Sequence, residues 1–411
     1  MKHICTRWWA VGVPLILVGA TSVLAQDWPQ WRGVHGDAKV SGFVAPQAWP
    51  SELKKGWTST LGSGVATPAL VGNRLYVFTR QAANEVIRCL NAGDGSEVWK
   101  HEYAAQEVGG AARRFGGPRS SPAVAEGKVV TSGVGGVLSC LDAATGELVW
   151  RKDPFPKVVP RFFASSSPLI VDGMAVAHLG GSGKGAIIAF DLASGNEKWR
   201  WGGEGPAYGS PTLMTVAGVK QVVTLAEKSV VGVGLADGKL LWKLPFAVAR
   251  YNTATPIVDG QIVIYGGAGR SALSIKAARI EKQGDGFVAK ELWENAEIAP
   301  MYNTPVLQGN LLFGLSNKGN LFCLNAETGK TAWTDSVQRD RRGYGSIVGT
   351  DSCLLALCGN SELVAFEPSD RGYVQLAQMK VSDTATHAYP VIAGNRIFVK
   401  DQETVTLWTL Q

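Results

Sequence analysis

The chain alternates short apolar segments with turns rich in glycine and acidic residues. Val129-Val130-Thr131 and Ile262-Val263-Ile264-Tyr265 are examples of segments dominated by β-branched and aromatic side chains. Between such segments stand pairs such as Asp172-Gly173 and Asp259-Gly260, which tolerate the positive φ that tight hairpin turns require. Apolar segments of this kind, bounded by turn residues, are typical of β-strands. The pattern therefore predicts an all-β protein of short strands joined by hairpins.

The strands are grouped in repeated units. Each unit opens on a hydroxyl residue and a proline, followed by a short apolar strand. Copies begin at Thr67-Pro68, Ser121-Pro122, Ser167-Pro168, Ser210-Pro211, Thr255-Pro256, Thr304-Pro305 and Tyr389-Pro390, and an eighth, Gly345-Ser346, lacks the proline. Their spacing of about 41 to 54 residues is close to the period of a four-stranded propeller blade.

A second signature closes most units. Five glycines each stand four residues before a tryptophan, namely Gly95, Gly146, Gly195, Gly238 and Gly329. A four-stranded sheet cannot bury both faces alone, so we expect the large indoles to pack between neighbouring blades. The tryptophans assigned to this role are Trp57, Trp99, Trp150, Trp199, Trp242, Trp293 and Trp333.

The two ends of the chain are predicted to complete one blade together. The unit that begins at Pro390 has room for only three strands before Gln411. Trp57 precedes the first proline strand and marks a spare fourth strand at the other end. We therefore predict a single eight-bladed β-propeller of four-stranded antiparallel blades over residues 57–411, preceded by a lead-in segment, residues 26–56. No second domain is expected.

The N-terminus has the layout of a secretory signal peptide over residues 1–25. Lys2 and Arg7 precede an apolar stretch that ends in Val23-Leu24-Ala25. A retained anchor is the alternative, although Pro14 interrupts a stretch that is marginal for spanning a bilayer. Removing two cations and no acids lowers the formal net charge from +6 to +4. This modest charge speaks against a nucleic-acid partner. We expect an exported protein, periplasmic or extracellular, with no transmembrane segment after cleavage.

The cysteines are predicted to be buried free thiols. Signal cleavage leaves an odd number, which argues against a full disulfide framework in an oxidising compartment. Cys353 and Cys358 are expected on one strand, where about 16 Å of extended backbone prevents a bridge. The other three are Cys89, Cys140 and Cys323.

The repeat resembles the PQQ-like β-propeller family, whose units read approximately Leu-x-Ala-x-Thr-Gly-x-x-x-Trp. Leu141 to Trp150 and Leu324 to Trp333 match it closely, and the resemblance extends from Trp57 to Gln411. The opening residues Asp27 to Gly33 resemble exported members of this family. Its members include quinoprotein dehydrogenases and BamB-type outer-membrane assembly propellers. The resemblance implies the fold strongly and the function weakly.

The residues favour a non-catalytic member. If the chain were a dehydrogenase of this family, the resemblance would imply a quinone that packs against a vicinal disulfide and lies over a calcium ion, with an aspartate as the catalytic base. This chain has no adjacent cysteine pair and no Cys-x-x-Cys-His haem motif. The segments around the first strands are poor in the acids that Ca²⁺ prefers, and we expect Asn252 and Asn303 to cap turns. We therefore predict no catalytic residue, no metal and no cofactor, and keep PQQ with Ca²⁺ as the alternative.

The loops that lead into the first strands combine arginines with aromatic side chains. In a propeller these loops share one face, and Arg with aromatics is typical of binding rims. The alternative is that the arginines are solvated residues of the rim and that the aromatic side chains only pack in the channel wall. The candidate binding residues are Arg113, Arg114, Phe115, Arg119, Arg161, Phe162, Arg250, Tyr251, Tyr302, Arg342, Tyr344, His387 and Tyr389. Hairpins on the same face add Lys184, Lys228, Arg270, Lys318 and Lys400, while the opposite face collects acidic turns.

Three functions are consistent with these observations. We favour an exported, monomeric binding or scaffolding propeller of the cell envelope, which recognises a protein or an acidic ligand through the basic and aromatic face. Assistance to outer-membrane protein assembly is its most specific version, but no cysteine follows the signal region, so no lipid anchor is expected. A quinoprotein oxidoreductase and a carbohydrate- or polyanion-binding propeller are the alternatives.

Overall fold

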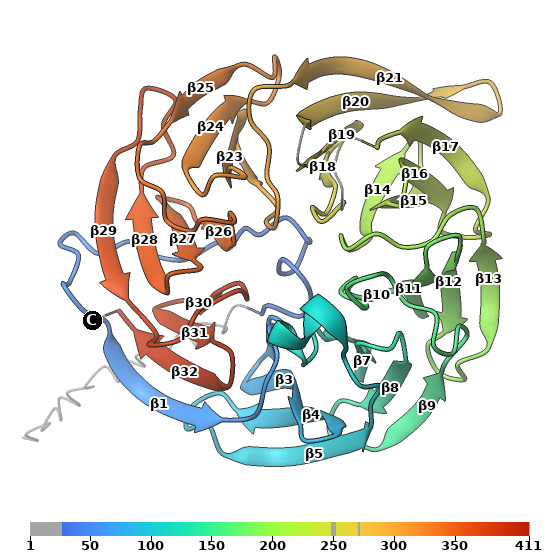
Figure 1. Cartoon of the computed structure of the whole chain (residues 1–411), viewed down its shortest axis with the longest axis horizontal. Coiled ribbons are helices and arrows are strands. Elements are labelled where there is room, and N and C mark those ends of the chain that lie inside the picture. The colour runs from blue at the N-terminus through green and yellow to red at the C-terminus, as the bar shows by residue number, and fades with distance from the viewer. Residues whose placement is uncertain (1–26, 248–251, 270–271, 411) are drawn as a thin grey trace, which may run out of the picture.

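Eight antiparallel sheets of four strands are arranged radially around a central channel in the computed structural model (Figure 1). The structure describes residues 27–247, 252–269 and 272–410. The eight-bladed propeller predicted from the repeat is therefore confirmed. The predicted signal peptide, residues 1–25, lies outside the described residues.

Each blade runs from a short innermost strand to an outer edge strand, and blades one to four follow the chain in order. Blade one holds β2 (Ala69–Val71), β3 (Arg74–Gln81), β4 (Asn84–Asn91) and β5 (Glu97–Ala104). Blade two holds β6 (Ala123–Ala125), β7 (Lys128–Ser132), β8 (Leu138–Asp142) and β9 (Leu148–Lys152). Blade three holds β10 (Leu169–Val171), β11 (Met174–Gly181), β12 (Lys184–Asp191) and β13 (Glu197–Trp201). Blade four holds β14 (Thr212–Val216), β15 (Val219–Leu225), β16 (Ser229–Gly234) and β17 (Leu240–Pro245).

The remaining blades close the ring. Blade five holds β18 (Ile257–Asp259), β19 (Ile262–Ala268), β20 (Leu273–Gln283) and β21 (Gly286–Asn295). Blade six holds β22 (Val306–Gln308), β23 (Leu311–Leu315), β24 (Leu321–Asn325) and β25 (Thr331–Thr334). Blade seven holds β26 (Gly345–Gly349), β27 (Leu354–Cys358), β28 (Glu362–Phe366) and β29 (Gln375–Lys380). Blade eight combines β30 (Val391–Ala393), β31 (Arg396–Lys400) and β32 (Thr404–Thr409) with β1 (Lys54–Thr60).

The N-terminal strand completes the last blade. β1 pairs antiparallel with β32, with Lys54 opposite Thr409 and Thr60 opposite Thr404. This pairing joins the beginning of the propeller to its end, so the ring cannot open without breaking the hydrogen bonds between β1 and β32. The described part of the chain contains no helix long and apolar enough to cross a membrane.

The Gly–Trp repeat is explained by contacts between successive blades. The Trp99 indole N–H of blade one donates to the Ala143 carbonyl of blade two over 3.2 Å. A Cβ on Gly146 would lie 2.5 Å from the Trp99 ring, and the Gly146 φ is +76°. Glycine is therefore required twice at this position, for space and for backbone conformation. The indoles of Trp57, Trp150, Trp199, Trp293 and Trp333 likewise donate to a carbonyl of the following blade.

Trp242 differs from the other blade tryptophans. Its indole donates to the Gln221 Oε1 atom of its own blade over 2.6 Å. Blade five replaces the short turn between its last two strands with the long hairpin β20–β21, so the usual acceptor turn is missing (Figure 1). Trp242 still packs in a buried cluster with Tyr265 and Ile280 of blade five.

A belt of side-chain hydroxyls surrounds the channel and accounts for the Ser/Thr-Pro repeat. The Ser121 backbone N–H donates to Ser167 Oγ over 2.9 Å, and the Ser167 N–H donates to Ser210 Oγ over 2.9 Å. Thr67, Ser210, Thr255 and Tyr389 donate to the next blade in the same way. Blade seven has Gly345 at this position and supplies no hydroxyl acceptor there, although the adjacent Ser346 hydroxyl donates to the Ala388 carbonyl, ahead of blade eight, over 3.4 Å. The hydroxyl thus links the innermost strands, which have no ladder partner on the channel side.

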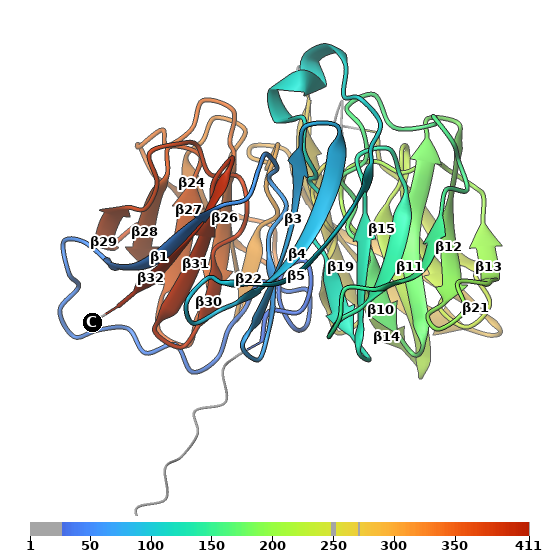
Figure 2. The same ribbon diagram turned by 90° about the horizontal axis from the view of Figure 1, so that it is seen from below.

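The lead-in segment crosses the face opposite the loops that begin each blade, and appears as the blue chain along the lower edge in Figure 2. Trp28 exchanges two backbone hydrogen bonds with Leu70 of β2. Further along, Val40 donates to Gly349 at the end of β26, so the segment ties blade one to blade seven. All five cysteines of the described residues are free and buried, as predicted.

Candidate functional site

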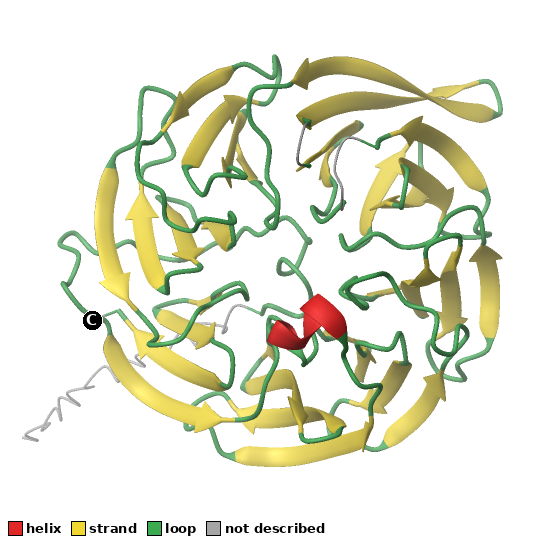
Figure 3. Cartoon of the chain, in the orientation of Figure 1, coloured by secondary structure: helices red, strands yellow, loops and turns green. Residues whose placement is uncertain are grey.

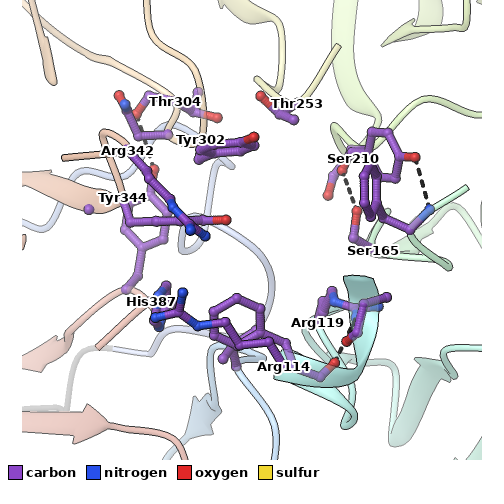
Figure 4. Close-up of a pocket in the computed structure, with 18 of the residues that line it drawn as sticks. Arg114, Arg119, Ser165, Ser210, Thr253, Tyr302, Thr304, Arg342, Tyr344 and His387 are labelled. Carbon is purple, nitrogen blue, oxygen red and sulfur yellow. Dashed lines mark hydrogen bonds between the residues drawn. The ribbon is translucent and has the colours of Figure 1, made fainter. Parts of the chain in front are cut away.

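The inter-blade loops converge on one cavity at the mouth of the channel. Its volume is about 420 Å³. All eight loops that lead into a first strand contribute to its lining, and Trp31 of the lead-in segment reaches it from the other side of the ring. Figure 4 shows side chains from these loops pointing into a common space.

Nine of the predicted binding residues line this cavity. They are Arg114, Phe115, Arg119, Phe162, Tyr302, Arg342, Tyr344, His387 and Tyr389. The exposed Arg113 lies on the same loop as Arg114 but outside the lining, 3.9 Å from Glu107. The Arg161 guanidinium stands over the Phe162 ring, also outside the lining. Arg250, Tyr251 and Arg270 fall outside the described residues.

A short helical segment overhangs the mouth (Figure 3). The 3₁₀ helix η1 (Gly110–Phe115) rises above the blades in Figure 2 and carries Arg114 and Phe115. The Arg119 side chain holds its carboxyl end, because Nη2 donates to the Ala112 and Phe115 carbonyls over 3.3 and 2.6 Å. Arg119 is thus fixed against the helix while its other terminal nitrogen remains uncommitted.

An aromatic wall occupies one side of the cavity. The Tyr302 and Tyr344 rings stack with centroids 4.6 Å apart and planes inclined by 12°. His387 meets Tyr344 edge to face at 4.8 Å, and Phe115 meets His387 in the same manner at 4.8 Å. Because the rings brace one another, the wall presents a fixed apolar surface.

The floor is formed by the lead-in segment and blade eight. Trp31 meets Tyr389 edge to face at 5.0 Å, and its indole N–H donates to Thr255 Oγ1 over 2.9 Å. Beneath them, the buried Arg32 guanidinium donates to the Tyr389 hydroxyl over 2.7 Å and to the Pro305 carbonyl over 2.8 Å. The lead-in segment therefore forms a floor across the channel, so the cavity opens only toward the face of the loops that begin each blade, as far as the described residues show.

Burial changes the ionisation of the groups in the cavity. It lowers the pKa of His387 to about 4, so the imidazole is neutral at pH 7. It also lowers the pKa of the Arg119 guanidinium and raises the pKa of the Tyr344 phenol. Two buried nitrogens in the lining, Arg119 Nη1 and His387 Nδ1, have no hydrogen-bond partner in the described residues. Unpaired buried polar atoms are costly, so two unmet hydrogen-bonding atoms in one lining are unusual for a wall without a ligand.

The prediction that Lys400 adds a basic side chain to this face is wrong. Lys400 is fully buried, with Nζ donating to the Gly64 and Asp401 carbonyls over 3.0 and 2.8 Å. Burial lowers its pKa to about 8. Its hairpin folds inward against the loop that contains Gly64, which the hydrophobic pattern of β31 did not indicate.

Several lining residues were missed at the sequence level. Trp31, Tyr208, Ser165, Ser210 and Thr253 all face the cavity. The hydroxyl of Ser210 belongs to the repeated Ser-Pro step, which was interpreted only as a repeat marker. Trp31 lies in the Asp27–Gly33 opening, whose path across the channel no repeat pattern specifies.

The donor set of the cavity does not fit a calcium ion with a quinone. Among the described residues that line it, none is Asp or Glu, whereas three are arginines. The described residues also contain no cluster of three or more His, Cys, Asp or Glu side chains arranged to hold a metal ion. Asn252 and Asn303 donate to backbone carbonyls, including those of Ala226 and Leu315, so both serve the loops. Hard cations prefer several carboxylate oxygens, which these loops do not supply.

Comparisons with known proteins point to propellers of two kinds. The family profile described as outer membrane protein assembly factor BamB matches residues 82–335. BamB of Xanthomonas campestris pv. campestris is 29% identical over 263 residues, which cover 60% of this chain and 60% of that protein. The quinohemoprotein alcohol dehydrogenase of Comamonas testosteroni is 26% identical over 191 residues, which cover 45% of this chain and 27% of that enzyme. The crystal structure of BamB from Moraxella catarrhalis, at 16% identity, gives a TM-score of 0.62 and covers 87% of this chain and 100% of that one.

Proposed function

Because this chain belongs to the family of PQQ-like propellers described as outer membrane protein assembly factor BamB, we propose that it is a non-catalytic recognition propeller of the cell envelope. Its mouth cavity binds an acidic group of a partner, and the ring of blades serves as a rigid scaffold that holds the binding loops. A role in outer-membrane protein assembly, as the names of its BamB relatives state for those proteins, is the most specific form of this proposal.

One observation carries the proposal. Arg114, Arg119 and Arg342 line a cavity whose described lining contains no carboxylate. A concave, positively charged opening attracts acidic groups, and guanidinium groups bind carboxylate and phosphate oxygens through charge-assisted hydrogen bonds. The arginines are not consumed by internal ion pairs, since none of the three forms a salt bridge with an Asp or Glu of the described residues.

The proposal is tested by photo-cross-linking in cells. The exposed Arg161 is replaced by p-benzoylphenylalanine, which places the reactive group on the rim, next to Phe162 and outside the set of lining residues. We expect a discrete adduct that is lost in R114Q/R342Q and retained in R113Q/R341Q. The second pair removes the same charges from the same loops, but Arg113 and Arg341 do not line the cavity. An adduct that responds equally to both double variants would contradict the proposal. The same probe at Glu126, in the turn between β6 and β7 on the opposite face, serves as the negative control.

A quinoprotein oxidoreductase is the second candidate, favoured by the quinohemoprotein relative and by the position of the cavity on the propeller axis. A carboxylated quinone would meet the three arginines. The lining supplies neither a carboxylate base nor calcium ligands, so no catalytic step is assigned to these residues.

A further inference from the structure

The cavity has two unlike walls. Loops before β6 and β26 bring in Arg114, Arg119 and Arg342. Loops before β10, β14 and β18 bring in hydroxyl groups from Ser165, Ser210 and Thr253. Figure 4 shows the labelled arginines and hydroxyl residues around the same central space. A ligand that satisfies both walls needs an anionic group as well as several neutral hydrogen-bonding groups.

The hydroxyl groups of Ser165, Ser210 and Thr253 can each make a further hydrogen bond, some as donors and some as acceptors. Ser165 Oγ donates to the Tyr208 carbonyl over 2.9 Å, and Thr253 Oγ1 donates to the Met301 carbonyl. Both oxygens therefore keep lone pairs that accept further hydrogen bonds. Ser210 Oγ accepts from the Ser167 N–H over 2.9 Å and keeps its own proton for donation. A wall that both donates and accepts matches alcohol groups, each of which also does both.

The arginine wall includes a preorganised donor. Two backbone carbonyls hold Arg119 Nη2, whereas its buried Nη1 has no partner in the described residues. The side chain is thus fixed before any ligand arrives, and it pays little ordering entropy on binding. Because Nη1 is itself shielded from solvent, Arg119 contributes a fixed positive charge to this wall, and the exposed guanidinium groups of Arg114 and Arg342 are those that a carboxylate can reach with charge-assisted hydrogen bonds.

The aromatic side chains give the cavity flat apolar surfaces that can select a ligand by its shape. Phe115, Phe162 and the stacked Tyr302 and Tyr344 give flat apolar surfaces beside both polar walls. A pyranose ring has an apolar C–H face that packs on such rings and an edge of hydroxyl groups. The volume of about 420 Å³ lies within the ~300–1,000 Å³ typical of small-ligand pockets. Protein–protein interfaces are instead broad surfaces that bury about 1,200–2,000 Å² in total.

We propose that the cavity binds a carboxylated sugar residue, a hexuronate, with the carboxylate at Arg114 and Arg342 and the sugar hydroxyls at the wall of Ser165, Ser210 and Thr253. The inference rests on the proposed recognition function and names its ligand class. An acidic peptide satisfies the arginines but brings few hydroxyl groups to the opposite wall. The sugar is either free or a residue of an acidic polysaccharide, and the two sources share this chemistry.

The test is isothermal titration calorimetry of the whole purified protein with galacturonate, trigalacturonate and the methyl ester of trigalacturonate. We expect saturable binding of the acid forms and a loss of about tenfold or more on esterification, which removes the charge and keeps the ring. R114Q/R342Q should weaken binding about tenfold or more, whereas R113Q/R341Q should stay within about twofold. Tighter binding of the trimer indicates a polysaccharide, and equal binding indicates a free sugar.

Three results would overturn the inference. One is the absence of binding by any uronate at millimolar concentration. Another is binding that esterification leaves unchanged, or that both double variants weaken equally. The third is arginine-dependent binding of hexaglutamate with no binding of uronates. The cross-link at position 161 distinguishes failure of the sugar assignment from failure of the proposed recognition function. If the cross-link still depends on Arg114 and Arg342, the recognition function stands and only the sugar assignment fails.

Discussion

Replacing Arg32 should loosen both the ring and the floor of the cavity. This residue of the lead-in segment is 1% exposed and bonds to two different blades. It donates to the Thr304 and Pro305 carbonyls at the start of β22 and to the Tyr389 hydroxyl before β30. The hydroxyl belt is interrupted between these points, because Gly345 has no side-chain oxygen. Arg32 thus links blades six and eight where the belt does not.

The size of the effect can be worked from these contacts. In Arg32→Met, the Thr304 carbonyl keeps the Tyr389 hydroxyl, 3.2 Å away, as a donor. The buried Pro305 carbonyl is left without its guanidinium partner, at a cost of about 1–3 kcal/mol, and the loss of the charge-assisted bonds to Thr304 and Tyr389 adds about 1–2 kcal/mol each. The bonds to the Gly36 and Asp37 carbonyls lie within the lead-in segment and are part-buried, so water can replace the lost donor there. Removing a buried charge that has no carboxylate partner offsets part of this. We expect a net destabilisation of about 3–5 kcal/mol, or about 4–6 °C for a chain of this size.

Thermal unfolding at a fixed scan rate, followed by circular dichroism, measures the change. Arg32→Lys should be intermediate, because one ammonium group cannot reach all three acceptors. Arg113→Met, an exposed control on η1, should shift the midpoint by less than about 1 °C. If Arg32→Met unfolds within about 1 °C of the unaltered protein, the lead-in segment does not brace the ring and this reasoning is refuted.

Three further predictions follow from the blade contacts and the buried histidines. Gly146→Ala, whose Cβ would lie 2.5 Å from Trp99, should destabilise the protein by about 2–4 kcal/mol in urea unfolding; Gly127→Ala, with φ +70° but no atom within 4 Å, should cost only about 1 kcal/mol, and equal losses would contradict the inter-blade account. Ser167→Ala leaves the buried Ser121 N–H unpaired and should cost about 1–3 kcal/mol, partly restored by Ser167→Thr; no recovery with threonine would argue against the belt. Burial lowers the pKa of His178 and His387 to about 4, below the roughly 6.5 of an unfolded histidine, so the folded state binds fewer protons between these values. Stability should therefore be complete above about pH 6.5 and decline as the pH falls toward 4, and H178Q/H387Q should flatten the urea midpoint over this range.

The repeat made the fold predictable because each signature residue has a direct structural role. The Gly–Trp spacing follows from Trp99 packing on Gly146 of the next blade, and the Ser-Pro step from the belt through Ser167. The convergence of the basic and aromatic loops could also be predicted, since all loops before first strands share one face. Trp31 could not be assigned to the cavity, because the path of the lead-in segment depends on tertiary contacts such as that of Trp31 with Tyr389. Lys400 was misplaced for the same reason: its buried position depends on a contact with the Gly64 carbonyl, which is distant in sequence.

The central claim is that the cavity recognises an acidic group without quinone catalysis, and the most direct test is PQQ binding to the purified protein with and without Ca²⁺. Absorbance spectroscopy and thermal shift would measure the binding, and alcohol-dependent dye reduction would measure activity. We predict that Ca²⁺ makes no difference to any binding of this carboxylated quinone, and that no dye is reduced. Saturable binding that requires Ca²⁺, together with alcohol-dependent dye reduction, would contradict the account and identify the protein as a quinoprotein dehydrogenase.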